Sequence, residues 1–409
     1  MNQPDPRSCD FVVFGATSFV GKILCSYLDT RLANTDQTWA IAGRDQAKLD
    51  AVKATLTTPV DTIIADAHDR SSLDELVGHA TVVISTVGPY ALHGSMLVEA
   101  AAAAGTDYCD LTGEPQWMQR MIDAHSEAAT GSGARLVHAC GFDSIPSDLG
   151  VAYTQESAIE RFGKPCSQIS MRVKAMNGGI SGGTAASMLQ LAEEAQNDPQ
   201  ARRILANPYA LAPDGMREGI AQPNVLAPRS DDVSGSWIAP FMMAAVNTRV
   251  VHRSHALLGR PWGNDFSYDE ATMTGTGAPG LARAAAVAAG VGGLAAASSV
   301  TPLRRALGSR VLPQPGEGPS PQAQRDGFYD LRFFGTTADG DTITTKVTGD
   351  RDPGYGSTAK MLGEAAIALS SADPADVPGG FWTAATAFGG TAFVTPLQAH
   401  AGLDFSVVE

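Results

Sequence analysis

The sequence predicts an α/β protein in which a Rossmann-type, doubly wound parallel sheet is followed by a second, mixed α/β domain. Three observations predict this class. Short apolar runs alternate with helical patterns through the first third of the 409-residue chain. The first run leads directly into a turn that begins and ends with glycine, and strand patterns return only after residue 168, among longer helices and loops. A chain of this length holds two or three domains, and we expect the first over residues 8–146 and the second over 147–409.

Six apolar runs of four or five residues mark the strands of the first domain: 11–14, 39–42, 62–65, 81–85, 107–111 and 136–139. Runs this short and this apolar are typical of strands that are buried on both faces. Between the first two runs, apolar residues recur with the spacing of one helical face, at Phe19, Val20, Ile23, Leu24, Tyr27 and Leu28. Strands that alternate with helices predict βαβ units and therefore a parallel sheet.

The first strand runs straight into seven residues that could hold a phosphate: Gly15, Ala16, Thr17, Ser18, Phe19, Val20 and Gly21. Small residues let the backbone approach a pyrophosphate, and the N-terminus of the following helix favours an anion. Ser18 stands where a middle glycine is usual, and its hydroxyl could cap the helix or donate to a phosphate. An ordinary tight turn between strand and helix is the alternative, since this spacing alone is a weak signal.

The residues after the second and third strands bear on the choice of nucleotide. An NAD site usually places an acidic residue after the second strand, where this chain has Arg44. A guanidinium matches a ribose 2′-phosphate in charge and geometry, so we expect NADP as the cofactor. In the alternative, Arg44 is a solvated loop residue and Asp45 binds the ribose. Asp66, after the third strand, could meet the adenine or cap the next helix.

The loop after the fourth strand is expected to line the same crevice, because the carboxyl ends of parallel strands meet at one edge of the sheet. We therefore count its residues as cofactor-binding candidates: Ser85, Thr86, Val87, Gly88 and Pro89. Tyr90 or His93 could then face the nicotinamide, and Tyr90 is a catalytic candidate. Either residue could equally have a structural role.

The turn after the sixth strand, residues 140–148, supplies a second catalytic candidate at the same edge. Asp143 could donate a proton if burial raised its pKa, and otherwise it caps a turn. Cys140 is better explained as a small buried hydrophobe than as a nucleophile, and Thr184 could contact substrate or cofactor. Catalytic side-chain motifs are not conspicuous, which suits an enzyme whose cofactor carries the difficult step.

Residues 147–409 mix strands and helices and are expected to form a substrate and dimerisation domain. Strand patterns occupy 169–174, 266–274, 329–336, 342–348 and 403–408. Helical patterns occupy 181–196, 237–258 with a break near Pro240, and 357–369, whereas 206–236 is predicted to be loop. The C-terminal segment could return to the first domain. A homodimer is expected, because open sheet edges and faces tend to be covered.

The segment 278–312 differs in composition from the rest of the chain. Residues 271–316 contain no Asp or Glu and four arginines, Arg283, Arg304, Arg305 and Arg310. The uncharged stretch between Arg283 and Arg304 is long enough to cross a bilayer, but it consists mostly of Ala, Gly, Val and Ser, and Ala and Gly gain little on insertion. We expect a packed or surface-lying helix, with contact to an anionic membrane or an acyl carrier as the second interpretation. Residues 312–322, with their four prolines, are predicted to form a flexible loop that could act as a lid.

The overall composition excludes some classes of binding partner and indicates where in the cell the protein is expected. A net charge of −14 argues against a protein that binds nucleic-acid backbones. Five scattered cysteines without a CxxC pair predict neither a disulfide framework nor a structural zinc site, and we expect no metal. The polar N-terminus has no apolar signal run, so the cytoplasm is the expected location, with a peripheral membrane contact through 278–312 as the open alternative.

Several of these motifs resemble those of the saccharopine dehydrogenase-like oxidoreductases. The resemblance rests on residues 15–21, 42–45, 87–90, 108–114 and 140–148 and continues at 181–184, 352–356 and 379–383. It spans nearly the whole chain and is strongest to the trans-acting enoyl reductases of actinobacterial lipid-polyketide biosynthesis; eukaryotic members are associated with membranes or lipid droplets. Ser18 departs from the usual Gly-Ala-Thr-Gly turn of the family. The resemblance implies a Rossmann domain with a mixed α/β second domain, and it leaves the substrate open.

Three functions agree with these observations. The first is an NADPH-dependent reductase of an α,β-unsaturated acyl thioester that works in trans with a lipid or polyketide synthase. The second is a saccharopine dehydrogenase-like reductase of an amino-acid adduct, for which Arg249 and Arg253, four residues apart on one helical face, could bind carboxylates. The third is a non-catalytic NADP-binding protein attached to membrane or lipid.

Overall fold

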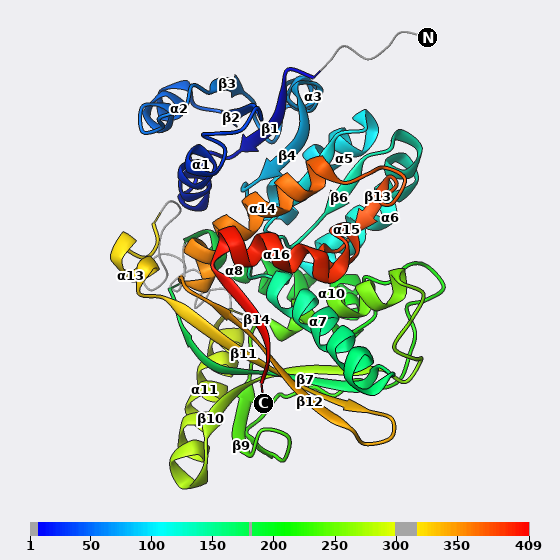
Figure 1. The fold of residues 1–409 in the computed structure, drawn as a ribbon. Coiled ribbons are helices and arrows are strands. Elements are labelled where there is room, and N and C mark those ends of the chain that lie inside the picture. The colour runs from blue at the N-terminus through cyan, green and yellow to red at the C-terminus, as the bar shows by residue number, and fades with distance from the viewer. Residues whose placement is uncertain (1–6, 180–181, 299–316, 409) are drawn as a thin grey trace.

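A computed structural model describes residues 7–179, 182–298 and 317–408 of the chain. Within these residues the strands form two seven-stranded sheets, one in the upper part and one in the lower part of Figure 1. Helices α7 (Ile145–Phe162) and α10 (Ala244–Leu257) pack against each other and lie between the two sheets.

The first sheet is parallel throughout, in the order β13-β6-β5-β4-β1-β2-β3. Its strands are β1 (Cys9–Phe14), β2 (Trp39–Gly43), β3 (Asp61–Ile64), β4 (Ala80–Ser85), β5 (Asp107–Asp110), β6 (Arg135–Val137) and β13 (Gly380–Trp382). The predicted α/β class with a Rossmann-type sheet is confirmed. One detail was wrong: β3 is exposed or half-buried rather than buried on both faces, because it is the edge strand. The seventh strand, β13, comes from the C-terminal part of the chain.

Two layers of helices cover this sheet. Helices α1 (Phe19–Arg31), α2 (Gln46–Lys53) and α14 (Thr358–Ser371) contribute to one hydrophobic layer, and α3 (Arg70–His79), α5 (Ser95–Ala104) and α6 (Pro115–Ser132) to the other. Successive residues of β1 point to opposite layers, Val13 to the first and Val12 to the second. The buried carboxylate of Glu364 fixes α14 to α1, since it accepts hydrogen bonds from Tyr27 Oη at 2.5 Å and Arg31 Nε at 2.7 Å.

The second sheet is mixed, in the order β14-β12-β11-β7-β10-β9-β8. Its strands are β7 (Cys166–Asn177), β8 (Arg229–Asp231), β9 (Ser236–Pro240), β10 (Ser267–Gly275), β11 (Phe328–Thr337), β12 (Thr342–Gly349) and β14 (Leu403–Val408). Only β7 and β10 pair in parallel. Helix α7 packs on the face of this sheet that is turned toward the first sheet (Figure 1). The two sheets support a division into two domains, and the boundaries 8–146 and 147–409 stay a prediction.

The helical region expected over 237–258, with a break near Pro240, was wrong in the part before the break. Residues up to Pro240 form β9, which pairs antiparallel with β10, and the helix α10 begins only at Ala244. Pairing with a distant strand outweighs the local helical pattern here. For the same reason β8, within the predicted loop 206–236, is a strand that pairs with β9.

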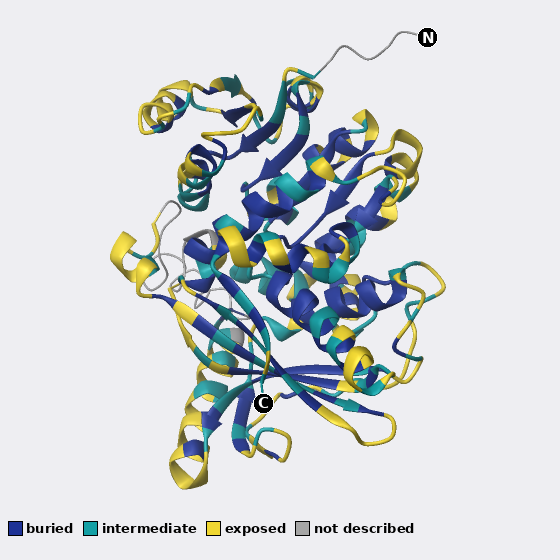
Figure 2. Ribbon diagram, viewed as in Figure 1, coloured by how far each residue is buried: buried dark blue, intermediate teal, exposed yellow. Residues whose placement is uncertain are grey.

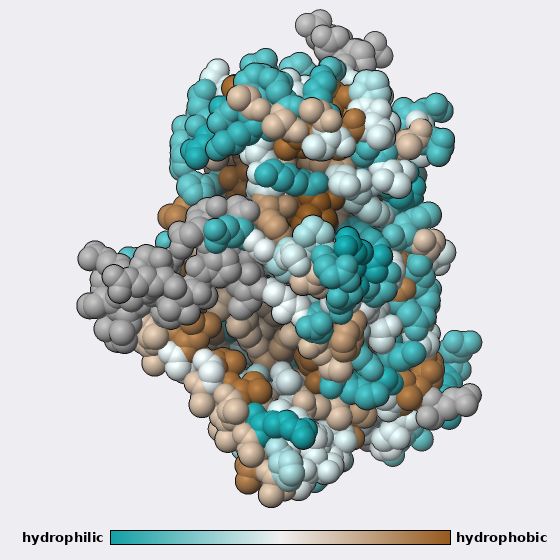
Figure 3. All heavy atoms as spheres, turned by 90° about the vertical axis from the view of Figure 1, so that its left-hand side faces the viewer, coloured by the Kyte–Doolittle hydropathy of each residue, from teal (hydrophilic) through white to brown (hydrophobic). Residues whose placement is uncertain are grey.

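Helix α11 (Gly277–Ser298) lies at the edge of the molecule and is mostly exposed (Figure 2). It packs against β9 and β10, and it is the one helix in the described ranges that is long and apolar enough to cross a membrane by length and composition alone. Apolar residues gather on the lower part of this side of the molecule (Figure 3). The surface-lying interpretation agrees with this position. Arg304, Arg305, Arg310 and residues 312–316 of the predicted lid lie outside the described residues.

The remaining helical elements are mostly short. They are α4 (Tyr90–His93), α8 (Gly182–Asn197), α9 (Pro199–Ala206), α13 (Pro321–Arg325), α15 (Ala384–Ala387) and α16 (Val394–Pro396), with helical turns at Pro353–Ser357, Gly390–Phe393 and Leu397–Ala401.

We expect Gly150→Ala to destabilise the fold by about 1–3 kcal/mol, because it overpacks the contact between α7 and the second sheet. A Cβ at this position would lie 2.2 Å from the Phe333 ring, which is fully buried. Urea unfolding followed by circular dichroism measures the change. Gly131→Ala is the matched control, since this helical glycine has no atom within 4 Å of the added Cβ and should be neutral or slightly stabilising. Equal stability of Gly150→Ala and wild type would contradict this account of the packing.

Candidate functional site

The turn between β1 and α1 is built closely enough that two of its positions require glycine. Gly15 has a positive φ of 86°, and a Cβ there would lie 2.6 Å from Val87 Cγ2. A Cβ on Gly21 would lie 2.2 Å from the Gly15 carbonyl oxygen. The turn therefore packs too closely for a side chain at either position, as is typical of a turn that brings backbone close to a pyrophosphate.

Ser18 occupies its place in this turn without strain. Its φ of −68° suits any residue, and its hydroxyl caps α1 by accepting from the Gly21 amide at 2.9 Å. The same hydroxyl lies 3.0 Å from Thr86 Oγ1, which donates to the Gly15 carbonyl at 2.9 Å. The first amides of α1 then point toward the crevice with the positive end of the helix dipole. The residues of this turn fit a dinucleotide pyrophosphate, although Ser18 replaces the usual glycine.

The charged side chains that follow β2 and β3 differ in whether they already have hydrogen-bond partners. Arg44 is exposed and has no ion pair or side-chain hydrogen bond to any residue that the structure describes. Asp45 caps α2 by accepting from the Lys48 amide at 3.1 Å, and Asp66 accepts from the His68 amide at 3.0 Å. Arg44 is therefore available for a 2′-phosphate, whereas Asp45 is already used by the helix. Asp66 holds the turn before α3, and Asp69 is the residue that caps that helix.

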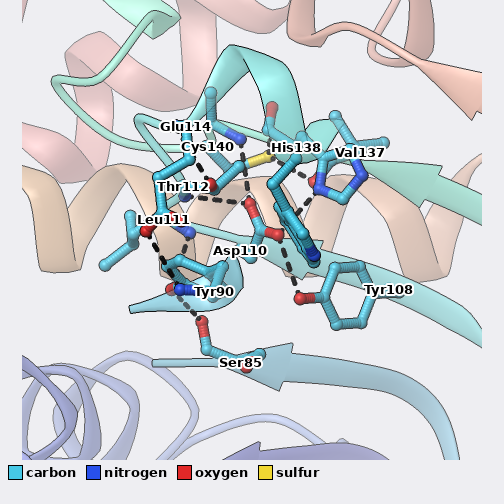
Figure 4. Close-up of polar contacts among 12 residues, drawn as sticks. Ser85, Tyr90, Tyr108, Asp110, Leu111, Thr112, Glu114, Val137, His138 and Cys140 are labelled. Carbon is cyan, nitrogen blue, oxygen red and sulfur yellow. Dashed lines mark hydrogen bonds and ion pairs between the residues drawn. The ribbon is translucent and has the colours of Figure 1, made fainter. Parts of the chain in front are cut away.

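Tyr90, a catalytic candidate from the sequence, has its hydroxyl held by two backbone groups. Its hydroxyl donates to the Ser85 carbonyl at 3.0 Å and accepts from the Leu111 amide at 3.1 Å (Figure 4). Burial raises the pKa of Tyr90 well above its ordinary value, and the nearby carboxylate of Asp110 adds to the rise. The tyrosine instead joins the loops that follow β4 and β5.

The buried carboxylate of Asp110 organises the same edge of the sheet. Its Oδ1 accepts from the amides of Thr112 and Ala139, each at 3.0 Å. Its Oδ2 accepts from Tyr108 Oη at 2.9 Å and lies 2.7 Å from His138 Nδ1 (Figure 4). One side chain at the end of β5 thus fixes the loop after β5 and the loop after β6.

Glu114 performs a similar task between the two domains. Its buried carboxylate accepts from the amides of Tyr90 at 3.0 Å and Ala91 at 2.8 Å, which begin α4. It also accepts from the Ser187 hydroxyl of α8 at 2.9 Å. A second contact, between Arg120 and Glu194 at 2.7 Å, holds α8 to α6. Helix α8 is therefore fixed over the loops of the first domain.

A cavity of about 300 Å³ lies where these loops meet the second domain. Polar atoms reach it from the loops, through Ser18, Thr86 and Asp143. The remaining wall is largely apolar and comes mostly from helices: Phe19, Val20, Leu111, Met188, Leu191, Met242, Met243 and Val246. Flexible methionines can adapt to a ligand of irregular shape. The cavity therefore suits a substrate with a reactive polar end and an apolar chain.

Asp143 lines this cavity, and its place at a substrate site stays a prediction. Burial raises the pKa of its carboxyl to about 7, and the charge of Asp110 acts in the same direction. A carboxyl with this pKa can carry a proton near neutral pH. Thr184 also lines the cavity, 3.0 Å from Tyr355 Oη. Cys140 is fully buried, and burial raises the pKa of its thiol well above the ordinary value, which agrees with a packing role.

The interpretation of Arg249 and Arg253 as carboxylate-binding residues was wrong. Both lie on α10, but they are buried and donate to backbone carbonyls. Arg249 donates to those of Ile204, Leu205 and Ala245, and Arg253 to those of Leu211 and Phe381. The hydrogen bonds from these two guanidinium groups hold loops against α10.

Sequence reasoning missed Asp110, Glu114 and the methionines of the cavity wall. Asp110 and Glu114 belong to the segment 108–114 that carried part of the resemblance, so the motif pointed to them without showing their task. Met242 and Met243 gave no signal, because they lie between β9 and α10 in a region that the sequence assigned to helix.

Comparison with known proteins adds to this geometry. Residues 11–137 match the family model of the saccharopine dehydrogenase NADP binding domain. A Mycobacterium tuberculosis protein named "Putative trans-acting enoyl reductase" is 42% identical over 378 residues, which cover 89% of each chain. A trans-acting enoyl reductase of Mycobacterium leprae is 35% identical over 379 residues, 90% of each chain. The fold is similar to that of saccharopine dehydrogenase (L-Glu forming) from Saccharomyces cerevisiae, with a TM-score of 0.55, 14% identity and coverage of 98% of this chain and 100% of that one.

We expect Gly21→Ala to weaken the binding of NADPH by at least about tenfold, because the added Cβ must displace the Gly15 carbonyl and with it the phosphate turn. Isothermal titration with NADPH measures the change. Gly78→Ala is the matched control, a glycine of helix α3 on the other face of the same sheet, with open space around the new Cβ. Wild-type affinity in Gly21→Ala would show that the nucleotide does not use this turn.

Proposed function

This chain belongs to the trans-acting enoyl reductase family, and we propose that it reduces an α,β-unsaturated acyl thioester with NADPH in lipid or polyketide biosynthesis. One observation carries the proposal. The phosphate turn, the carboxyl of Asp143 and a methionine-rich apolar wall all line a single cavity. Such a cavity can hold a reactive thioester end near the cofactor and the acyl chain against the wall.

Enoyl reduction adds a hydride to the β-carbon and a proton to the α-carbon of the thioester. The bound nicotinamide supplies the hydride. The side chain of Asp143 supplies the proton from a carboxyl oxygen, since burial keeps a large share of this group protonated at neutral pH. The apolar wall excludes water from the reacting carbons, and α8, held by Glu114 and Arg120, closes one side of the space.

The two other functions have less support. A saccharopine-like substrate with several carboxylates needs convergent cations, and Arg249 and Arg253 are buried against backbone carbonyls instead. A non-catalytic protein would not need a carboxyl with a raised pKa in an otherwise apolar cavity.

The substrate is proposed to arrive bound to a carrier, because the related enzymes are named for action in trans. We further propose a cytoplasmic homodimer that touches an anionic membrane through α11. Helix α11 exposes its apolar residues on a chain whose net charge is −14, and its single charged residue is Arg283. A helix of this kind can lie in a membrane interface without crossing it.

The reaction is tested directly by incubating the protein with NADPH and enoyl thioesters of increasing chain length. Oxidation of NADPH, together with a product two mass units heavier, supports the proposal. NADPH that binds without any turnover of enoyl thioesters, whether on coenzyme A or on a carrier protein, would contradict it.

For Asp143→Asn we expect kcat to fall by about 100- to 10,000-fold while the Kd for NADPH stays unchanged, because the amide cannot supply the proton. The wild-type kcat/KM should fall as the pH rises through about 7, since only the protonated carboxyl is active. Stopped-flow absorbance at 340 nm over a pH series measures both effects.

The matched control is Asp143→Glu, which keeps a carboxyl in the cavity and should retain a decline at high pH with a smaller loss of kcat. If Asp143→Asn retained full activity and the same pH profile, another group would be the donor.

Leu281→Glu combined with Val291→Glu on α11 should reduce flotation of the protein with vesicles that contain anionic lipid, because each change places a negative charge in the apolar surface. The control is Leu226→Glu, a residue that is 78% exposed and does not belong to α11. Wild-type protein that does not float with such vesicles would rule out the membrane contact.

A further inference from the structure

Two histidines meet at the edge of the first sheet, close to the expected position of the adenosine. His68 follows β3, and His93 lies in α4, after β4. These strands are separated in the sheet by β1 and β2, yet His68 Nε2 lies 2.9 Å from His93 Nδ1 and the ring centroids are 5.0 Å apart. The pair therefore connects the loop after β3 to α4 across the carboxyl ends of β1 and β2.

Strand register places Arg44 at the same edge. The Ala65 amide donates to the Gly43 carbonyl at 3.1 Å, so the chain leaves β2 at Arg44 directly beside the place where it leaves β3 at Asp66. Arg44 is close enough to His93 for its charge to lower the pKa of that ring. The three basic side chains thus surround one part of the crevice.

The distance between the two rings determines which of their nitrogens can donate a hydrogen bond. A nitrogen-to-nitrogen distance of 2.9 Å requires one N–H donor and one lone pair, so the two rings share a single hydrogen bond. The outer nitrogens, His68 Nδ1 and His93 Nε2, have no hydrogen-bond partner within the described ranges. In the neutral pair one outer nitrogen donates and the other accepts. After one proton is added both outer nitrogens donate, and the pair carries a positive charge, which is the form that an anionic phosphate prefers.

The surroundings of His93 disfavour its protonation in the absence of an anion. Burial, His68 and Arg44 all lower the pKa of His93, and only Asp66 opposes them. Arg70 of the neighbouring α3 is occupied by Asp74 and Glu99, each at 2.7 Å. The negative charge of a phosphate placed among Arg44, His68 and His93 acts against these effects and favours protonation of the pair.

We propose that His68 and His93, together with Arg44, bind the adenosine 2′-phosphate and enable this chain to distinguish NADPH from NADH. The proposal rests on the assignment of NADP as the cofactor and does not depend on the acyl substrate. NADH carries a hydroxyl at the same position and gives the pair no charge to bind.

The test compares adenosine 2′,5′-bisphosphate with 5′-AMP, which differ only in the 2′-phosphate, by isothermal titration calorimetry. In His68→Gln and His93→Gln we expect the preference for the bisphosphate to fall by about tenfold, with the Kd for AMP unchanged. In the wild type the bisphosphate should bind more tightly at pH 6.5 than at pH 8.5, and this dependence should be lost in the variants. The matched control is His125→Gln, a half-buried histidine of α6.

Each outcome decides the proposal. An equal loss of affinity for both nucleotides would assign the pair a structural role and overturn it, as would an unchanged preference. A wild-type protein that fails to prefer the bisphosphate would overturn it together with the NADP assignment. A selective loss in the variants supports it even if no enoyl thioester is reduced, so failure of the reductase function is distinguishable from failure of this site.

Discussion

The buried carboxylate of Asp110 is the constraint on which the site depends. It accepts four hydrogen bonds at the end of β5, two from backbone amides and two from side chains. One of the amides belongs to Ala139, whose positive φ of 59° is unfavourable for a residue with a Cβ. The carboxylate therefore holds a strained turn, and this turn directs the chain after β6 toward Asp143. Without these bonds, the loop that carries the proposed proton donor would lose its anchor.

Burial at this edge of the sheet also raises the pKa of the proposed proton donor, Asp143. Asp143 lies where water is scarce and where the charge of Asp110 opposes a second negative charge, so its pKa rises to about 7. Glu114 repeats the arrangement on the other side of the cavity, where its buried carboxylate joins α4 to Ser187 of α8. Carboxylates thus do two different tasks at this edge. Those with several donors fix the backbone, and the one that faces the cavity can exchange a proton.

Local patterns predicted the first sheet well, because its strands follow one another along the chain and each is a short apolar run. They could not predict β13, whose place beside β6 depends on residues more than 200 positions away. The pattern around Trp237 was helical by composition, and pairing with β10 made it a strand. In the site, the phosphate turn and Asp143 were found from their positions after strands. The hydrogen-bond partners of Arg249 and Arg253 could not be found in this way, because they are backbone carbonyls, which every residue type carries.

The origin of the cavity wall suggests how this fold adapts to different substrates. The polar side of the cavity comes from loops at the ends of the parallel strands, and we propose that the same loops bind the cofactor. The apolar side comes mainly from α8 and from the residues that begin α10, among them Met188 and Met243, which belong to the second domain. Changes in those helices would alter the acyl chain that fits while leaving the phosphate turn and Asp143 in place. This division agrees with the general observation that one fold can carry different chemistries when the residues around its site change.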